Sequence, residues 1–362
     1  MPRRSRSVAN DKNEKKKTGA VTLQHIGDKL GLSRTTISLA LRNHPRISDA
    51  TKKRIAATAS KLGYEPDQVA RTLATGRSNL IGVVVPNIAD HVYSEVFRGI
   101  EESAQLAGYH VLLSNGSYEA ANTAGRLSDM MKLKIAGIIA APPFQSESLP
   151  AAPLWKEIKK SGFPFVLLNR ELDPPIFHQV TIDNKGGIRL AMEMLSSLGH
   201  KRVAYMTGSV DIIPIRQRYK AFRELSPKYG FDVDEQLVER CELSAQGGYE
   251  SCVRLWGRLK KKPTAIMVFS DTPAQGVMRF LHQQNIRVPE AVSVLGFDGT
   301  DSSEFSQISL STVVTPLYEM GKQAFHLLAQ EMDAPQAQPR SILLPVRLVV
   351  RESVSRIATR TS

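Results

Sequence analysis

The stretch TLQHIGDKLGLSRTTISLAL, residues 22–41, decides how the first part of this chain folds. Its first half repeats apolar residues at helical spacing, namely Leu23, Ile26 and Leu30. Gly31 then interrupts the run where a tight turn can use a positive φ, and Ser33 follows as the expected N-cap of a second helix. The apolar side of that second helix is formed by Ile37, Ala40 and Leu41. Two short helices joined by a glycine turn are typical of a helix-turn-helix, whose second helix lies in the DNA major groove; a solvated helical hairpin in another kind of domain is the alternative.

A third helix and a connector are expected downstream. The pair Ser48-Asp49 can cap the helix, Gly63 ends it, and its apolar residues are Ala50, Ile55, Ala59 and Leu62. Residues 66–78 form the connector, which contains a short amphipathic piece. Residues 1–20 are basic and lack an apolar run, so we expect a disordered arm that either attracts phosphates non-specifically or has no role.

The rest of the chain alternates between strand-like and helical patterns. Continuous apolar runs such as LIGVVV, residues 80–85, are typical of strands buried on both faces. Strands are expected at residues 80–85, 109–114, 135–141, 165–168, 180–183, 203–207, 265–269 and 292–297, with helices between them. This alternation predicts parallel sheets covered by helices, in a body long enough to divide into two lobes. Ligands bind such sheets at the carboxyl ends of the strands.

Charge is distributed unevenly along the 362 residues. The formal net charge is +13, and residues 1–80 alone carry 17 lysines and arginines against 6 acidic residues. The remaining sequence is close to neutral. This asymmetry indicates a polyanionic partner for the N-terminal module and a neutral ligand or partner for the body.

The cysteines and the N-terminus indicate the compartment. Cys241 and Cys252 have neither metal-ligand nor redox spacing, which favours a reducing environment over a disulfide framework. The basic N-terminus lacks the apolar core of a secretory signal, and no apolar run reaches transmembrane length. We therefore expect a cytoplasmic protein with no membrane partner.

Three stretches carry a resemblance to a known family: VTLQHIGDKLGLSRTTISLALRNHPRIS at 21–48, LGYEPDQVARTLATGRSNLIGVVVPN at 62–87 and VSVLGFDGTDSS at 292–303. With these motifs in order, the chain resembles the LacI/GalR family of transcription regulators over nearly everything after residue 20. The resemblance implies an all-α helix-turn-helix DNA-binding module followed by a two-lobed α/β effector domain of the periplasmic-binding-protein-like type I. The implied divisions are a basic arm (1–20), the DNA-binding domain (21–65), a hinge helix and linker (66–78), the effector-binding and dimerisation domain (79–353) and a tail (354–362).

The resemblance assigns base reading to the exposed side of the second helix. Arg34 and Thr35 match positions that face base edges, and an arginine bound to guanine O6 and N7 is worth roughly 1–3 kcal/mol of discrimination. Leu39 stands where many relatives carry arginine, so it either meets a thymine methyl group or packs against the module. The residues that match phosphate-contacting or capping positions are Thr22, Ser33, Thr36, Ser38 and Asn43.

A hinge helix implied by the resemblance enters the DNA minor groove. Ala70 and Leu73 match its DNA-contacting positions, and Leu73 is expected to wedge between base pairs and kink the DNA. The sequence departs from the family pattern at Asp67, where relatives mostly carry asparagine. An acidic side chain close to DNA puts a contact at that position in doubt.

The effector-binding positions implied by the resemblance are Asp90, Tyr93, Asn169, Arg170, Arg218 and Asp298. A neutral polyol is typically held by carboxylates that accept from its hydroxyls, an arginine that donates back and an aromatic ring. Relatives often carry phenylalanine where this chain has Val92. The aromatic ring that packs against a polyol must therefore come from Tyr93 or from another residue. Asp183 and Asp271 are expected to cap the helices that follow them.

The motifs of nucleotide-binding loops, hydrolases and zinc proteases are absent, so we expect no enzyme activity, no cofactor and no metal site. The expected function is transcriptional regulation, in particular repression, by a homodimer that binds a palindromic operator in double-stranded DNA. A small-molecule effector, in particular a carbohydrate, is expected to control that binding. Two alternatives remain: the same fold sensing a purine or nucleoside, and a sugar-binding protein without a gene-regulatory role.

Overall fold

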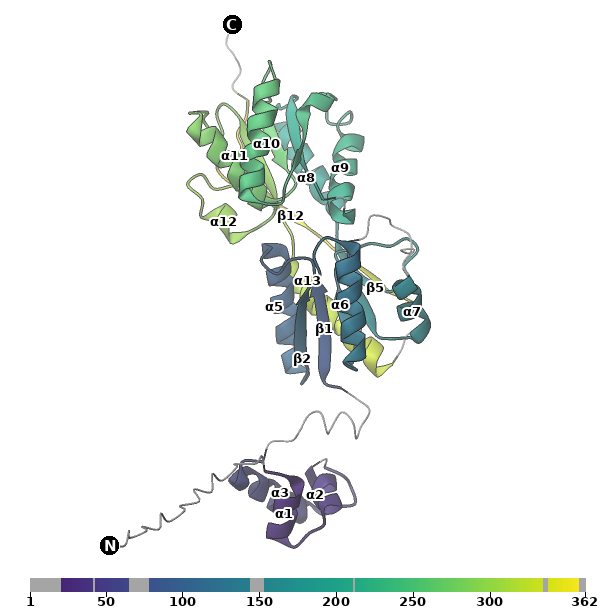
Figure 1. Cartoon of the computed structure of the whole chain (residues 1–362). Coiled ribbons are helices and arrows are strands. Elements are labelled where there is room, and N and C mark those ends of the chain that lie inside the picture. The colour runs from purple at the N-terminus through teal and green to yellow at the C-terminus, as the bar shows by residue number, and fades with distance from the viewer. Residues whose placement is uncertain are drawn as a thin grey trace, which may run out of the picture. The chain divides into compact units, whose positions relative to one another are not determined.

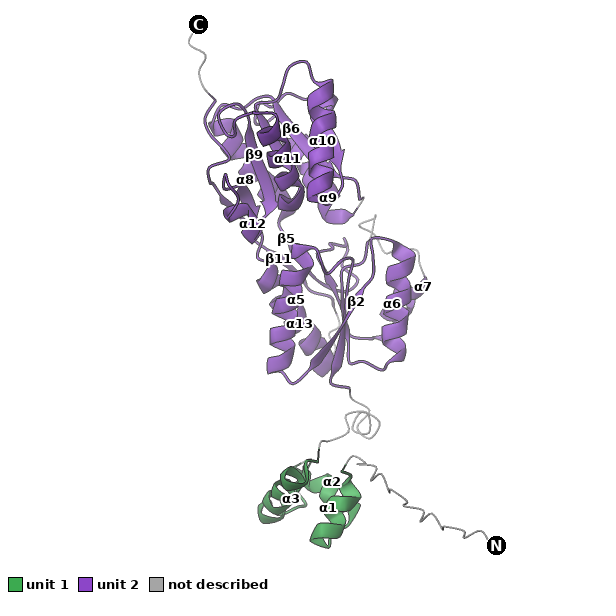
Figure 2. Ribbon diagram, turned by 60° about the vertical axis from the view of Figure 1, so that its left-hand side comes forward, with its two compact units in different colours: residues 1–77 green, residues 78–362 purple. Residues whose placement is uncertain are grey.

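The computed structural model describes residues 21–41, 43–64, 78–143, 153–210, 212–334 and 338–357. The chain divides into two compact units, residues 1–77 and residues 78–362, which are coloured separately in Figure 2. The expected basic arm and hinge helix, with Ala70 and Leu73, lie outside the described residues. Each unit has its own apolar core.

The first unit is built from α1 (Leu23–Leu30), α2 (Arg34–Leu41) and α3 (Asp49–Leu62). Its core contains one fully buried isoleucine from each helix, namely Ile26, Ile37 and Ile55. Gly31 and Gly63 both have φ +67, so α1 and α3 end in the left-handed region, as the sequence predicts. Leu41, expected on the apolar side of α2, is instead 37% exposed, because it is the last residue of that helix and lies outside the apolar cluster of the unit.

The second unit consists of two lobes, each built on one sheet (Figure 1). The sheet of the first lobe has the strand order β11-β5-β4-β3-β1-β2, and its described pairs are parallel. Its strands are β1 (Leu80–Val85), β2 (His110–Asn115), β3 (Ile138–Ala140), β4 (Phe165–Leu168), β5 (His178–Ile182) and β11 (Ser341–Leu344). Its helices are α5 (His91–Leu106), α6 (Ala120–Lys132), α7 (Pro153–Ser161) and α13 (Leu317–Asp333).

The sheet of the second lobe has the strand order β12-β10-β9-β8-β6-β7, in which β12 alone is antiparallel to its described neighbour. Its strands are β6 (Val203–Gly208), β7 (Val238–Cys241), β8 (Ala265–Val268), β9 (Ser293–Asp298), β10 (Ser311–Val314) and β12 (Arg347–Val349). Its helices are α8 (Asn184–Ser197), α9 (Ile213–Leu225), α10 (Ala245–Arg258), α11 (Asp271–Gln283) and α12 (Asp301–Glu304), with a 3-10 turn at Glu235–Leu237.

The chain passes between the lobes after β5, after β10 and between β11 and β12. As a result α13, which comes late in the sequence, lies beside α5 in the first lobe (Figure 1). Two glycines allow this close crossing: a Cβ on Gly99 would lie 2.1 Å from the carbonyl oxygen of Tyr318, and one on Gly321 would lie 2.0 Å from that of Val96. The crossing therefore requires glycine on both helices.

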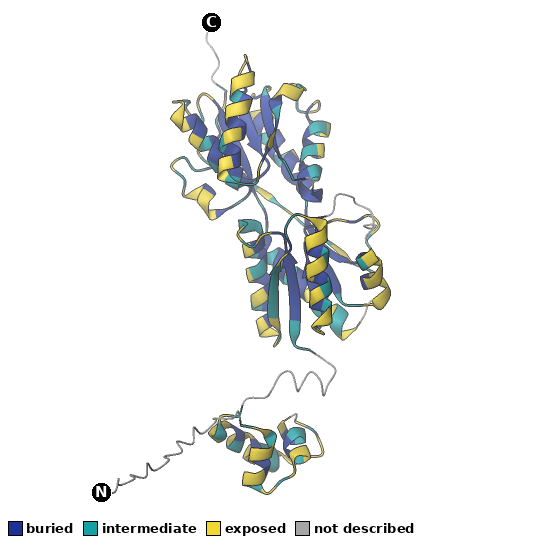
Figure 3. Ribbon diagram, in the orientation of Figure 1, coloured by how far each residue is buried: buried dark blue, intermediate teal, exposed yellow. Residues whose placement is uncertain are grey.

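The sequence prediction is right for the alternating core and incomplete at the end. It ends at residue 297 and so misses α12, β10, α13, β11 and β12, and it also misses the earlier strand β7. Strands β11 and β12 are short and half-exposed, so no continuous apolar run marks them. Figure 3 shows the buried residues concentrated in the central strands and on the helix sides that cover them. No helix in the described part of the chain is long and apolar enough to cross a membrane.

Candidate functional site

The exposed side of α2 is the first candidate site. Ser33 caps the helix, since its Oγ accepts from the backbone N–H of Thr36 at 3.1 Å, as predicted. The hydroxyls of Ser33 and Thr36 are also 2.9 Å apart, which holds Thr36 against the cap. Arg34 and Thr35 are exposed, and Arg34 makes no hydrogen bond or ion pair with any described residue. Both side chains are therefore free to contact another molecule.

The other described residues that the sequence predicts to contact DNA lie at the start of α1, on α2 and just after it. The backbone N–H of Thr22 donates to His25 Nδ1 at 3.1 Å at the start of α1. Asn43 has φ +54 and follows the end of α2, a conformation that asparagine tolerates better than most residues. Ser38 and Leu39 are half-buried, and Leu39 lies outside the apolar cluster of the unit. Leu39 is thus not a core residue.

A cavity of about 40 Å³ lies between the two lobes of the second unit. Five of the six predicted effector-binding residues line it, namely Asp90, Tyr93, Asn169, Arg218 and Asp298. They come from the carboxyl end of β9, from loops and helix starts that follow other strands, and from α9. The sixth, Arg170, does not line the cavity: it is fully buried, and its guanidinium donates to the carbonyl oxygens of Pro142 and Asn169. These two carbonyl oxygens accept hydrogen bonds from the buried guanidinium and so offset the cost of its burial.

Arg218 is the centre of the polar network in the cavity. Its Nε donates to Asn184 Oδ1 at 2.8 Å, and its Nη1 donates to the Phe269 carbonyl at 2.7 Å and to Asp298 Oδ1 at 3.1 Å. The guanidinium also stacks on the ring of Phe297, 3.6 Å from the ring centroid. Its Nη2 makes no hydrogen bond to a described residue, so it can donate to a ligand.

Asp298 is held in a strained conformation at the end of β9. Its φ is +113, which is rare for a residue with a side chain, and its Oδ2 accepts from Ser270 Oγ at 2.6 Å. Burial raises the pKa of Asp298 above its usual range, although the Arg218 guanidinium opposes that shift. The strain indicates that the surrounding contacts fix this carboxylate at the cavity wall.

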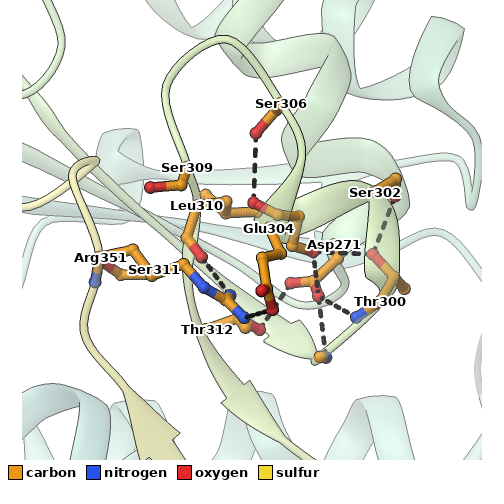
Figure 4. Close-up of polar contacts among 12 residues, drawn as sticks. Asp271, Thr300, Ser302, Glu304, Ser306, Ser309, Leu310, Ser311, Thr312 and Arg351 are labelled. Atoms are coloured by element: carbon orange, nitrogen blue, oxygen red, sulfur yellow. Dashed lines mark hydrogen bonds and ion pairs between the residues drawn. The ribbon is translucent and has the colours of Figure 1, made fainter.

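The loop that follows Asp298 is held by the buried carboxylate of Asp271 (Figure 4). Its oxygens accept from the backbone N–H groups of Gly299 and Thr300, both at 2.8 Å. They also accept from the hydroxyls of Ser303 at 2.6 Å and Thr312 at 2.7 Å. The expectation that Asp271 caps its own helix is therefore wrong, because four donors from the loop after β9, from α12 and from β10 engage the carboxylate instead.

Asp183 caps α8 as predicted, since its Oδ1 accepts from the backbone N–H of Gly186 at 2.7 Å. Asp90 caps α5 in the same manner: its Oδ1 accepts from the Val92 N–H at 3.1 Å. Burial, and then the negative charge of Asp298, raise the pKa of Asp90 to about 6. The two carboxylates therefore interact across the boundary between the lobes.

Asn169 gives the clearest indication that the cavity binds a ligand. It is 7% exposed, has φ +51 and lines the cavity, yet its Oδ1 has no hydrogen-bond partner among the described residues. An unpaired buried carbonyl oxygen costs free energy unless a donor meets it. A ligand hydroxyl or amine would supply that donor.

Sequence reasoning missed Tyr118, Asn184 and Phe297. Tyr118 lines the cavity, and its hydroxyl lies 3.4 Å from Asp90 Oδ2. It follows β2, so the rule that sites form at the carboxyl ends of strands could have found it. Val92 lines the cavity as well, which leaves Tyr93 and Tyr118 as the aromatic residues from the first lobe. Nothing in the local sequence marks Asn184 or Phe297.

Two family models match the chain. Residues 22–67 match bacterial regulatory proteins of the lacI family, and residues 192–354 match a periplasmic binding protein-like domain. The HTH-type transcriptional regulator DegA of Bacillus subtilis (strain 168) is 30% identical to this chain over 341 residues, which are 93% of this chain and 99% of DegA.

Solved structures share the fold. A lac repressor dimer bound to operator and the anti-inducer ONPF has a TM-score of 0.84 at 24% identity and covers 94% of this chain and 100% of its own. A complex of the transcriptional regulator CelR with cellobiose has a TM-score of 0.68 at 25% identity and covers 92% of this chain and 99% of its own. The predicted fold class, a helix-turn-helix unit followed by a two-lobed α/β unit, is thus confirmed.

Proposed function

Because this chain belongs to the LacI family of bacterial regulatory proteins, we propose that it is a repressor that binds a palindromic operator as a homodimer and senses a neutral polyhydroxylated molecule, in particular a carbohydrate. One observation carries the proposal: a single chain joins an exposed Arg34–Thr35 pair on a helix-turn-helix to a polar cavity in which Asn169 Oδ1 lacks a described partner. A regulator of this kind acts where the DNA is, in the cytoplasm, and needs no catalytic step.

The DNA-binding half of the proposal is supported by the first unit. Arg34 and Thr35 reach base edges from the start of α2, and Leu39 lies one turn later on the same helix. Thr22, Ser33, Thr36, Ser38 and Asn43 position the unit on phosphates or cap its helices. A twofold dimer places two such units on half-sites separated by about one DNA turn or a multiple of it. Ala70 and Leu73 add the minor-groove contact.

The effector half is supported by the charges that line the cavity. Asp90 and Asp298 bring two carboxylates, whereas Arg218 is the cationic side chain of the lining and already pairs with Asp298. A phosphorylated or carboxylated ligand would therefore bring a negative charge to a lining whose cation, among the described residues, is already paired. A neutral polyol donates to Asp90, Asn169 and Asp298 and accepts from Arg218 Nη2. A nucleoside offers similar ribose hydroxyls and is the alternative effector.

Regulation follows from linkage between the two sites. The effector binds between the lobes and changes their closure, and closure changes the spacing of the paired connectors in the dimer. Operator affinity then changes because the effector binds the two states of the body with different affinities. The size of the change is set by that difference.

In vitro selection of DNA sites from a random pool, with the purified full-length protein, tests this function. Recovery of one palindrome supports the proposal. Repeating the selection with D-ribose, cellobiose or adenosine shows which of these ligands changes the recovery of that palindrome. Recovery of unrelated sequences under every condition contradicts it, because the first unit would then be a non-specific anchor.

A further inference from the structure

A chain of hydrogen bonds runs from the first lobe to the effector cavity. Glu171 lies in the loop after β4, and its Oε2 accepts from Gln217 Nε2 on α9 at 2.8 Å. The side-chain oxygen of Gln217 accepts from Asn184 Nδ2 at 3.0 Å. Asn184 Oδ1 in turn accepts from Arg218 Nε, and the Arg218 guanidinium also binds Asp298.

We propose that Gln217 is a latch that couples closure of the two lobes to the orientation of Arg218. Glu171 belongs to the first lobe, whereas Gln217, Asn184 and Arg218 belong to the second. The Gln217 amide uses its nitrogen toward Glu171 and its oxygen toward Asn184, so losing one bond lets the side chain rotate away from the other. The consequence for effector and operator binding rests on the function proposed above, but lobe closure itself does not.

The position of the latch links it to ligand entry. Gln217 precedes Arg218 in the sequence, and Glu171 follows Asn169 by two residues, and both of these neighbours line the cavity. With a volume of about 40 Å³, the cavity is far smaller than the roughly 300–1,000 Å³ of typical ligand pockets. We therefore expect a ligand of sugar size to enter as the lobes separate, which would break the bond between Glu171 and Gln217. The bond re-forms when the lobes close.

The surroundings make this bond easy to break. Glu171 is exposed and Gln217 is half-buried, and both line a hollow of about 350 Å³ together with Lys220. Water reaches the bond there, and exposed charge-assisted contacts contribute little net stability. The Arg218–Asp298 pair, in contrast, is almost fully buried. The latch can thus open without disrupting the pair that binds the ligand.

Distances between spin labels on the two lobes of the full-length protein test the proposal, with neither DNA nor ligand present. Exposed positions 126 on α6 and 260 after α10 accept cysteine labels. Burial raises the pKa of both native thiols, Cys241 and Cys252, so they stay protonated and label slowly. An excess of unlabelled protein keeps two labelled copies from associating, so that the measured distances are those within one chain.

Gln217→Glu retains an acceptor for Asn184 but places a second carboxylate against Glu171. The closed population is expected to fall about threefold to tenfold, and Glu171→Ala, in an exposed loop, should lower it as well. Combining Gln217→Glu with Glu171→Gln exchanges donor and acceptor and should restore the closed distance. Lys220→Gln is the matched control on α9, since its ion pair is with Glu224 on the same helix, and should change nothing.

An unchanged distance distribution in Gln217→Glu overturns the proposal, as does a double variant that stays as open as Gln217→Glu. Operator affinity, measured on the same variants, separates this inference from the function proposed above. In one outcome, the distances shift as expected while neither the parent protein nor any variant binds a specific DNA site. That outcome supports the latch and contradicts the repressor function.

Discussion

Arg218 is the residue on which the cavity depends most. It is 5% exposed, and its guanidinium satisfies Asn184, the Phe269 carbonyl and Asp298. Arg218→Ala should therefore remove the effector response and also lower the free energy of unfolding by about 3–5 kcal/mol, because it leaves the Asp298 carboxylate buried without its cationic partner. Urea unfolding of the full chain measures this loss.

Arg216→Ala is the matched control for that substitution. Arg216 is half-exposed on the same helix and makes no side-chain hydrogen bond with a described residue, so its loss should change stability by less than about 0.5 kcal/mol. Equal effects of the two substitutions would mean that the Arg218 network does not stabilise the lobe.

Asp90 should make stability depend on pH. Its pKa is raised from 3.8 to about 6, so the folded protein holds the proton more tightly than the unfolded chain does between these values. The stabilisation that protonated Asp90 gives the folded protein is present below about pH 4 and is lost as pH rises through 6. Asp90→Asn retains an N-cap for α5 and carries no charge. It should stabilise the protein relative to the parent at pH 7 and much less at pH 4; an equal difference at both pH values would contradict burial of the charge.

Arg34 is expected to read one base pair in each half-site. Its exposed guanidinium has no described partner, and a bidentate contact to guanine is worth roughly 1–3 kcal/mol. Arg34→Ala should relax the preference at one position per half-site when binding is measured on a panel of single-base operator variants. A uniform loss of affinity for all operator variants would instead show that Arg34 contacts a phosphate.

At the scale of elements, the first lobe depends on the crossing of α5 and α13. A Cβ on Gly321 would lie 2.0 Å from the Val96 carbonyl oxygen and 2.9 Å from the Ile100 nitrogen, both backbone atoms that cannot swing aside. Gly321→Ala should force the helices apart and destabilise the protein by about 1–3 kcal/mol in urea unfolding. Gly125→Ala on α6 is the control, because nothing lies within 4 Å of its added Cβ. That substitution should stabilise α6 by up to about 1 kcal/mol, and a similar gain at Gly321 would refute the close crossing.

At the scale of the whole molecule, the two units should fold independently. Their apolar clusters are separate: Ile26, Ile37 and Ile55 lie in one, and the sheets of the lobes form the others. A fragment of residues 78–362 should therefore melt within about 2 °C of the main transition of the full chain in calorimetry, since no shared core is lost. It should also lose all DNA affinity. A large drop in the melting temperature would show that the first unit stabilises the body.

The sequence by itself determined the local elements, because each depends on residues close in the chain. Helical spacing, Gly31, Gly63 and the Ser33 cap specify the helix-turn-helix, and apolar runs specify strands β1, β4, β6, β8 and β9. Five of the residues that line the cavity could be found from family motifs and from the rule that ligands bind at the carboxyl ends of strands.

Only the tertiary structure decided which distant segments meet. It places α13 against α5 through Gly99 and Gly321, and it pairs β11 with the first sheet and β12 with the second. It also brings Asp271 against the loop after β9 and buries the Arg170 guanidinium against the Pro142 carbonyl oxygen. No local pattern encodes these outcomes, because a buried charge adopts whichever partners the packed chain brings within hydrogen-bonding distance.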